Sequence, residues 1–276
     1  MEKRLHTSYE TYIKSINEEV LNEKLFNVDD DVDYIIEKSG IEEFYNQVKE
    51  GKTPHFYEII DDKEVAFLAI DSSELKSEDA IKANEVNPIS IFIGFPNGRS
   101  GSHYNPLDKY ILVSPNRTAF KILYKKEDEF LSDQELETFK NEFKLERLKH
   151  ALAHELSHWI SDSLHSSHIQ KIIDRANELN DAEYMKLKKH DVNMTYFEID
   201  AIVHSIKELK RQYTQEEWDQ LTFRQIMLEY TALSAVDKTL KSKYGLEIAL
   251  IWQKNLFKRM QREGLLGLNM KSFYKN

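Results

Sequence analysis

The sequence predicts an α+β fold in which a small, mostly antiparallel sheet packs against a predominantly helical C-terminal half. Two observations predict this. Short apolar runs bounded by turn residues occupy the region from His55 to Tyr124, whereas long apolar patterns with helical spacing dominate from Ser132 onward. The two kinds of pattern do not alternate along the chain, which disfavours a parallel βαβ architecture. With 276 residues, 41% of them hydrophobic, the chain is long enough to bury a substantial core.

Residues 1–52 are expected to form a helical N-terminal extension. Two stretches carry apolar residues at helical spacing, namely Tyr12, Ile13, Ile16, Val20 and Leu21, and then Tyr34, Ile35, Phe44 and Val48. We expect residues 53–276 to form one domain, with a sheet part over 53–125 and a helical part over 126–276.

Within the sheet part, His55–Ile60 and Val65–Ile70 predict a β-hairpin around Asp61-Asp62-Lys63. The remaining elements expected here are a polar helix over Ser72–Val86, strands over Ile89–Phe95, Tyr110–Val113 and Ala119–Tyr124, and an exposed loop over Pro96–Ser102. The run Tyr110–Pro115 is expected to lie at the edge of the sheet, because proline is tolerated where a strand ends or lacks a neighbour.

Helix-start signals appear twice in the C-terminal half. Ser132 and Glu135 form a capping pair, which predicts a helix beginning near Asp133, and no Gly or Pro interrupts the chain before Leu164. Thr214 and Glu217 form a second such pair. Helical periodicity then continues through Met227, Tyr230, Leu233, Ile248, Ile251 and Leu256.

The composition restricts the classes of function. Cysteine is absent, so any metal must be held by histidines and carboxylates. A net charge of -10 argues against binding nucleic acid through its phosphates. The N-terminal residues are charged rather than apolar, and no apolar stretch is long enough to cross a bilayer. We therefore expect a soluble, cytoplasmic protein without a signal peptide and without membrane contact.

The run His154-Glu155-Leu156-Ser157-His158 carries the clearest chemical signal in the sequence. Residues four apart on a helix lie on nearly the same face, with Cβ atoms about 6 Å apart, so both imidazoles can reach one ion. Tetrahedral zinc held this way has room for a third protein ligand and a water molecule. Glu155, on the flank of the two histidines, is suited to take a proton from that water.

The apolar residues around this motif predict where the histidines point. A continuous stripe recurs every fourth residue, formed by Leu148, Leu152, Leu156, Ile160 and Leu164. His154 follows Leu152 by about 200° around the helix. The histidines therefore face away from the stripe, and we expect them to lie over a cleft or solvent.

The third ligand is expected on the helical segment Tyr196–Ser205, whose core stripe includes Ile199, Ile202 and Val203. Glu198 lies beside this stripe in line with Ala201 and Ser205, and these small residues would let the segment approach the motif helix closely. Asp200 lies on the other flank. The periodicity does not choose between Glu198 and Asp200.

The motif followed by a helical glutamate resembles the zincin metallopeptidases, specifically the gluzincin branch typified by thermolysin. The fragment Glu198-Ile199-Asp200-Ala201 also resembles, more faintly, the ImmA/IrrE-type peptidases. The resemblance covers little more than residues 150–205. It implies a zincin-like fold, one Zn²⁺ per chain held by His154, His158 and Glu198, and hydrolysis of a peptide or protein substrate by an endopeptidase with Glu155 as general base. Metzincins are disfavoured, because no Gly-x-x-His follows His158.

The sequence departs from the gluzincin pattern in two places. Ile202 replaces the acidic residue expected four positions after the third ligand, and the insert between the two motifs is long and rich in lysine. These differences bear on how the histidines would be oriented.

Other polar residues lie near the motif. His150 lies about 12 Å from His158 along the helix and is expected to be a solvated neighbour. Asp162 either orients a histidine or forms a surface pair. His204 is the first choice for stabilising an oxyanion, ahead of Tyr196, His168 and His103. His103 and Tyr104 are expected to be solvated loop residues, whereas Trp159 and Trp252 fit core packing.

Two alternatives to an enzyme remain at this point. The chain could be a protein-binding or regulatory module on a zincin scaffold with a vestigial or structural metal site, or a metal-free interaction protein. A peptidase would need an exposed strand edge to hold an extended peptide. The oligomeric state is left open.

Overall fold

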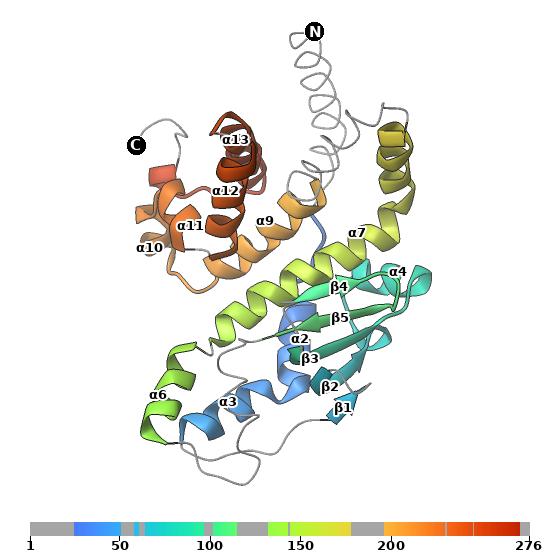
Figure 1. The fold of residues 1–276 in the computed structure, drawn as a ribbon, viewed down its shortest axis with the longest axis vertical. Helices are drawn as coiled ribbons and strands as arrows, with labels where there is room; N and C mark the ends of the chain where they lie inside the picture. Colours follow the sequence, from blue (N-terminus) through green and yellow to red (C-terminus); the bar gives the residue numbers. More distant parts are fainter. Residues whose placement is uncertain are drawn as a thin grey trace. The chain divides into compact units, whose positions relative to one another are not determined.

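The computed structural model describes residues 25–50, 58–60, 64–96, 102–114, 132–142, 144–177, 196–229, 231–244 and 246–270 (Figure 1). It confirms an α+β architecture, with a small sheet in the N-terminal half and helices throughout the described C-terminal half. The helix predicted before residue 25, the loop over 97–101 and the strand Ala119–Tyr124 lie outside the described residues.

Contacts along the chain separate two compact units. Of the described residues, a sheet unit contains those from Asn27 to Asn177 and His204–Thr214, and a helical unit contains Leu25, Phe26, Tyr196–Val203 and those from Gln215 to Met270. The division crosses helix α9, which is continuous from Tyr196 to Lys210.

The sheet has five described strands in the order β1-β2-β3-β5-β4. Their bounds are Glu58–Ile60 (β1), Glu64–Asp71 (β2), Ser90–Pro96 (β3), His103–Asn105 (β4) and Tyr110–Val113 (β5). The β1–β2 pair is antiparallel, which confirms the predicted hairpin, and so are the β2–β3 and β4–β5 pairs. Strands β3 and β5 run parallel. The sheet is therefore mixed, with one parallel pair among antiparallel ones.

The expectation that Tyr110–Pro115 lies at the edge of the sheet is wrong. Strand β5 lies between β3 and β4, so β4 forms the edge among the described strands. His103 and Tyr104, expected in a loop, lie in strand β4, because a tight reversal follows them. The Asn105 side chain accepts hydrogen bonds from the backbone N–H groups of Leu107 and Asp108, which turns the chain back into β5.

One face of the sheet packs against helices of the same unit. Helix α2 (Asp29–Ser39) packs against β2, and helix α7 (Leu145–Asn177) packs against β4 and β5. Strand pairing places Ile91, Ile111 and Tyr104 on this face, and both isoleucines are fully buried. On α7, the predicted stripe residues Leu148, Leu152, Leu156 and Ile160 are fully buried, as is Trp159. The predicted core side of the motif helix is confirmed.

The remaining helices of the sheet unit complete its core. They are α3 (Ile41–Lys49), the short 3₁₀ helix η1 (Ser72–Glu74), α4 (Glu78–Val86) and α6 (Asp133–Glu142). Helix α6 begins where the Ser132–Glu135 pair predicted, with Ser132 N–H donating to the Glu135 carboxylate. The stretch without Gly or Pro that follows Asp133 contains two helices, since α6 ends at Glu142 and α7 begins at Leu145. The Lys144 carbonyl accepts the first backbone hydrogen bonds of α7, from Arg147 and Leu148.

The helical unit contains the first half of α9, followed by short and long helices. These are α10 (Gln215–Gln220), α11 (Phe223–Glu229), α12 (Thr231–Tyr244), α13 (Leu246–Arg262) and the 3₁₀ helix η2 (Leu268–Met270). Helix α10 starts directly after Thr214, as predicted. Trp218 and Trp252 are fully buried, which confirms the core role expected for Trp252. Across the described residues, no helix combines the length and apolar character needed to traverse a membrane.

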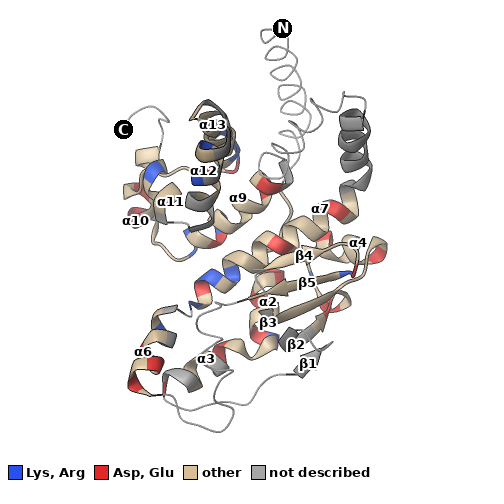
Figure 2. Ribbon diagram, in the orientation of Figure 1, with Lys and Arg blue, Asp and Glu red and all other residues tan. Residues whose placement is uncertain are grey.

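A buried carboxylate fixes α2 to the segment that leads into α4. Three aspartates open α2 (Figure 2), and Asp31, the third, is fully buried. Its Oδ1 atom accepts hydrogen bonds from the backbone N–H groups of Lys76 (2.9 Å) and Ser77 (3.1 Å). Helix α4 packs in turn against α7. Asp31 therefore links α2, through α4, to the motif helix α7.

We predict that Asp31→Ala lowers the free energy of unfolding by about 2–3 kcal/mol, because one buried and one part-buried backbone donor lose their acceptor. Asp30→Ala is the matched control. It removes an exposed carboxylate from the same helical turn and should cost less than about 1 kcal/mol. Urea unfolding followed by circular dichroism measures both, and equal losses would contradict the role of Asp31.

Candidate metal centre

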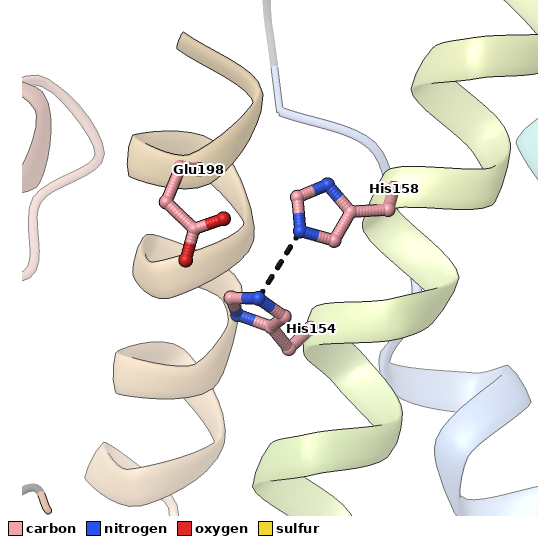
Figure 3. A group of neighbouring side chains, drawn as sticks. All are labelled: His154, His158 and Glu198. Carbon is pink, nitrogen blue, oxygen red and sulfur yellow. Dashed lines mark hydrogen bonds between the residues drawn. The ribbon is translucent and has the colours of Figure 1, made fainter. Parts of the chain in front are cut away.

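Helices α7 and α9 bring His154, His158 and Glu198 together (Figure 3). One potential ligand atom from each residue lies within 4.8 Å of those of the other two, and all three side chains are half-buried. Within the described part of the chain, this is the one group of three or more histidines, cysteines or acidic residues close enough to hold a metal ion. A possible metal-binding triad therefore forms at the motif found in the sequence.

The spacing of the two histidines fits a shared cation. Their Nε2 atoms lie 3.1 Å apart, with the rings nearly perpendicular at 84°. Two nitrogen ligands of a tetrahedral zinc, each about 2.05 Å from the ion, are separated by about 3.3 Å. Two imidazole nitrogens facing each other need a proton or a cation between them, since two lone pairs repel. The arrangement therefore fits a metal ion shared by the two rings.

Both histidines lie on one side of the motif helix because they are four residues apart, and another side of this helix is anchored to α4. There the Trp159 indole N–H donates to the backbone oxygen of Asn87 at 2.8 Å. His154 and His158 are half-buried beside α9. The expectation that they point away from the core stripe is confirmed, but they face a neighbouring helix rather than open solvent.

The structure distinguishes the two carboxylates that the sequence left open as the third ligand. Asp200 is engaged by Arg259, whose Nε lies 2.7 Å from Oδ1 and whose second guanidinium nitrogen lies 3.1 Å from Oδ2. Arg259 is fully buried and also approaches Glu263 at 3.4 Å. Both oxygens of Asp200 are thus committed to an ion pair with α13. Glu198, on the other flank of α9, is the carboxylate that joins the histidines.

Small residues allow α9 to approach α7, as the sequence indicated. Ala201 and Ser205 are fully buried. The Ser205 hydroxyl donates a hydrogen bond of 2.9 Å to the backbone oxygen of His150 on α7. A longer side chain at this position would hold the two helices further apart.

Glu155 lies in the same helical turn as the ligands and is 7% exposed. It is offset from His154 by about 100° around the helix, so it flanks the cluster and does not belong to it. Its carboxylate thus neighbours the cluster without being one of the three grouped ligands.

The expectation of a solvated His150 is wrong. Its side chain is 6% exposed, and the Gln212 side-chain amide donates to its Nε2 atom at 2.7 Å. Burial, assisted by the positive charge of Arg147, lowers the pKa of His150 from 6.5 to about 4. His150 is therefore a neutral, buried hydrogen-bond acceptor one turn before His154. The sequence did not reveal this, because Gln212 lies far along the chain.

Asp162 and Tyr104 form an unexpected pair. The Tyr104 hydroxyl donates to Asp162 Oδ2 at 2.8 Å and accepts from the Asn87 side chain at 3.0 Å. Burial, together with the Asp162 charge, raises the pKa of Tyr104 well above its usual value. Tyr104 is thus a strand residue that ties edge strand β4 to α7, and Asp162 is its acceptor rather than part of an i,i+4 surface pair.

The residues considered for oxyanion stabilisation lie in different parts of the structure. His204 is fully buried on α9 and does not belong to the metal cluster. His103 precedes Tyr104 on β4, so its side chain points to the opposite face of the sheet, where it contacts the Tyr110 hydroxyl at 3.1 Å. The side chains of Tyr196 and His168 lie outside the described residues. An oxyanion-stabilising role for His204 stays a prediction.

We predict that Glu198→Gln weakens zinc binding by about a hundredfold, because the amide is a neutral and poorer ligand. Asp200→Asn tests the neighbouring carboxylate. It should change zinc affinity by less than about threefold but lower thermal stability, since it leaves the buried Arg259 charge poorly paired. Competition titration against a chromophoric chelator measures affinity. The reverse order of effects would assign the ligand role to Asp200.

A second prediction concerns the stability of the metal-free protein below neutral pH. His150 stays neutral in the folded state down to about pH 4, whereas the unfolded chain takes up this proton near 6.5. Folding stability should therefore fall as the pH drops from about 6.5 to 4, and His150 contributes about 2 kcal/mol of the loss by pH 5.

The variant His150→Gln removes this contribution. Its loss of unfolding free energy between pH 7 and pH 5, measured with chelator present, should be about 2 kcal/mol smaller than that of the wild type. Identical losses in the two proteins would show that His150 is not buried in its neutral form.

No protein-family model, curated protein or solved structure matches this chain. The functional assignment therefore depends on the chemistry of the described residues.

Proposed function

We propose that this protein is a zinc-dependent metallopeptidase, with His154, His158 and Glu198 as ligands and Glu155 as general base. The observation that carries the proposal is the His-His-Glu cluster with a further carboxylate in the same turn of α7. Two imidazoles and one carboxylate are the ligand set of catalytic zinc sites that keep a fourth position for water or substrate. The absence of cysteine fits this choice of ligands.

Zinc, when bound, supplies a Lewis acid that lowers the pKa of water and polarises a carbonyl group. Glu155 would remove the proton from the attacking water and deliver it to the leaving amine. Its place in the same helical turn as the two histidines supports this task. His154 and His158 would remain neutral ligands throughout.

The edge of the sheet supports a peptide as the substrate. Strand β4 is the edge among the described strands and packs against α7, the helix that carries both histidines. An extended peptide can add to such an edge through backbone hydrogen bonds, which give affinity without strong sequence preference. The Tyr104–Asp162 hydrogen bond would hold this edge at a fixed distance from the motif helix.

One observation favours the alternative of a structural metal in a protein-binding or regulatory module. Glu155 is only 7% exposed, and the three ligands are half-buried. In structural zinc sites protein ligands fill all four coordination positions, whereas catalytic sites keep one position for water or substrate, which must be able to reach the ion. Zinc binding without turnover of any peptide would favour this alternative.

We predict that Glu155→Gln retains one zinc per chain but loses at least about a hundredfold in the rate of peptide hydrolysis, because the amide cannot accept the proton. Glu146→Gln is the control. It makes the same change at an exposed position in the first turn of α7 and should leave the rate unaltered.

Elemental analysis and mass-spectrometric digestion of a peptide library measure the two properties. Full hydrolysis by Glu155→Gln would exclude Glu155 as the base. A zinc-loaded wild type that cleaves no peptide in the library would exclude the peptidase.

A further inference from the structure

Two hydrogen bonds at His150 connect α7 with α9 and with the turn that follows α9. The backbone oxygen of His150 accepts a hydrogen bond from the Ser205 hydroxyl at 2.9 Å, and its ring nitrogen accepts one from the Gln212 amide at 2.7 Å. Ser205 is fully buried and His150 is 6% exposed. We call these three residues the His150 clamp.

The clamp lies in line with the metal ligands on both helices. His150 precedes His154 by one helical turn, about 6 Å along α7. Ser205 follows Glu198 by two turns, about 10 Å along α9, and the two side chains differ by only about 20° in direction. The ligand face of α7 and the ligand face of α9 therefore meet twice, once at the clamp and once at the cluster.

The apolar contacts of α9 are less able to fix its register. Its core residues Ile199, Ile202, Val203 and Ile206 are buried and apolar, and apolar packing has little directional preference. A slip of one residue would move Glu198 by about 1.5 Å and rotate it by about 100°, which would remove it from the histidines. A buried serine hydroxyl, in contrast, loses its acceptor when the helix slips.

Charged residues surround the same end of α9. Asp33 on α2 bridges Lys149, next to His150 on α7, and Arg211, next to Gln212. Although burial raises the pKa of Asp33, its hydrogen bonds to Arg211 and Lys149 hold it below the usual value. Because these side chains are partly exposed, each ion pair contributes little alone. These ion pairs lie at the partly exposed side of the clamp, whereas Ser205 is buried.

We propose that the His150 clamp sets the register of α9 against α7 and so positions Glu198 as the third metal ligand, which makes Ser205 and Gln212 positioning residues for the metal site. The inference rests on the metal-binding part of the proposed function and does not depend on peptide hydrolysis. It concerns side chains that touch neither the metal nor a substrate.

The first test compares two buried serines. Ser205→Ala should lower zinc affinity about tenfold, in the range seen when groups that orient metal ligands are removed. Ser163→Ala is the matched control, because the Ser163 hydroxyl is also buried but donates to Trp159 within its own helix, at 2.7 Å. It should leave zinc affinity unaltered. Gln212→Ala, at a more exposed position, should lower zinc affinity about threefold. This variant still tests the clamp if the Ser205→Ala protein does not fold.

A spectroscopic signature separates positioning from a general loss of stability. The visible absorption of bound Co²⁺ reports the number and geometry of its ligands. Ser205→Ala should shift the Co²⁺ spectrum towards that of Glu198→Gln, whereas Ser163→Ala should retain the wild-type spectrum. A wild-type spectrum for Ser205→Ala, with unaltered affinity, would overturn the inference.

A double-mutant cycle with Glu198 decides the mechanism. If Ser205 acts through Glu198, Ser205→Ala should cause no further loss of zinc affinity in a Glu198→Gln background. A tenfold loss in both backgrounds would show that Ser205 acts on the histidines or on folding, and would overturn the inference. A wild type that binds zinc without cleaving peptides would refute the peptidase alone, whereas a wild type that binds no zinc would refute the metal site and the clamp together.

Discussion

The candidate metal centre depends on one constraint, the register of two helices that are far apart in the sequence. Helix α7 supplies two imidazoles one turn apart, which any helix with this motif would do. The third residue of the cluster, Glu198, comes from α9, so its position depends on packing between helices. A displacement of about one residue in either helix separates Glu198 from the histidines. The buried serine and histidine between these helices are the directional contacts that resist such a displacement.

A second set of interactions holds the motif helix itself. The sheet contributes a buried isoleucine face, and the indole of Trp159 is bonded to the backbone at the end of α4. Asn87, which accepts that bond, also donates to Tyr104 on the edge strand. The fully buried Asp31 fixes the segment that leads into α4. The sheet, α2 and α4 thus together hold α7 in place. The half-buried histidines lie on the side of α7 that faces α9.

Much of this arrangement was predictable because local patterns determine it. The leucine stripe fixed the buried side of α7, the Ser132–Glu135 pair marked the start of α6, and the β1–β2 hairpin followed from two short apolar runs. The spacing of His154 and His158 identified the metal motif. Periodicity could not choose between Glu198 and Asp200, because that choice depends on the distant Arg259, which engages Asp200. The burial of His150 and the edge position of β4 could not be predicted either, because each depends on a partner or a turn that the local pattern does not reveal.

The central claim is that His154, His158 and Glu198 hold one zinc ion. Anomalous diffraction at the zinc absorption edge, from crystals of the zinc-loaded protein, tests it most directly. The account predicts a single strong peak per chain, about 2.0–2.2 Å from both Nε2 atoms and from one oxygen of Glu198. A peak at another group of residues, or a zinc ion bound to Asp200 in place of Glu198, would contradict it.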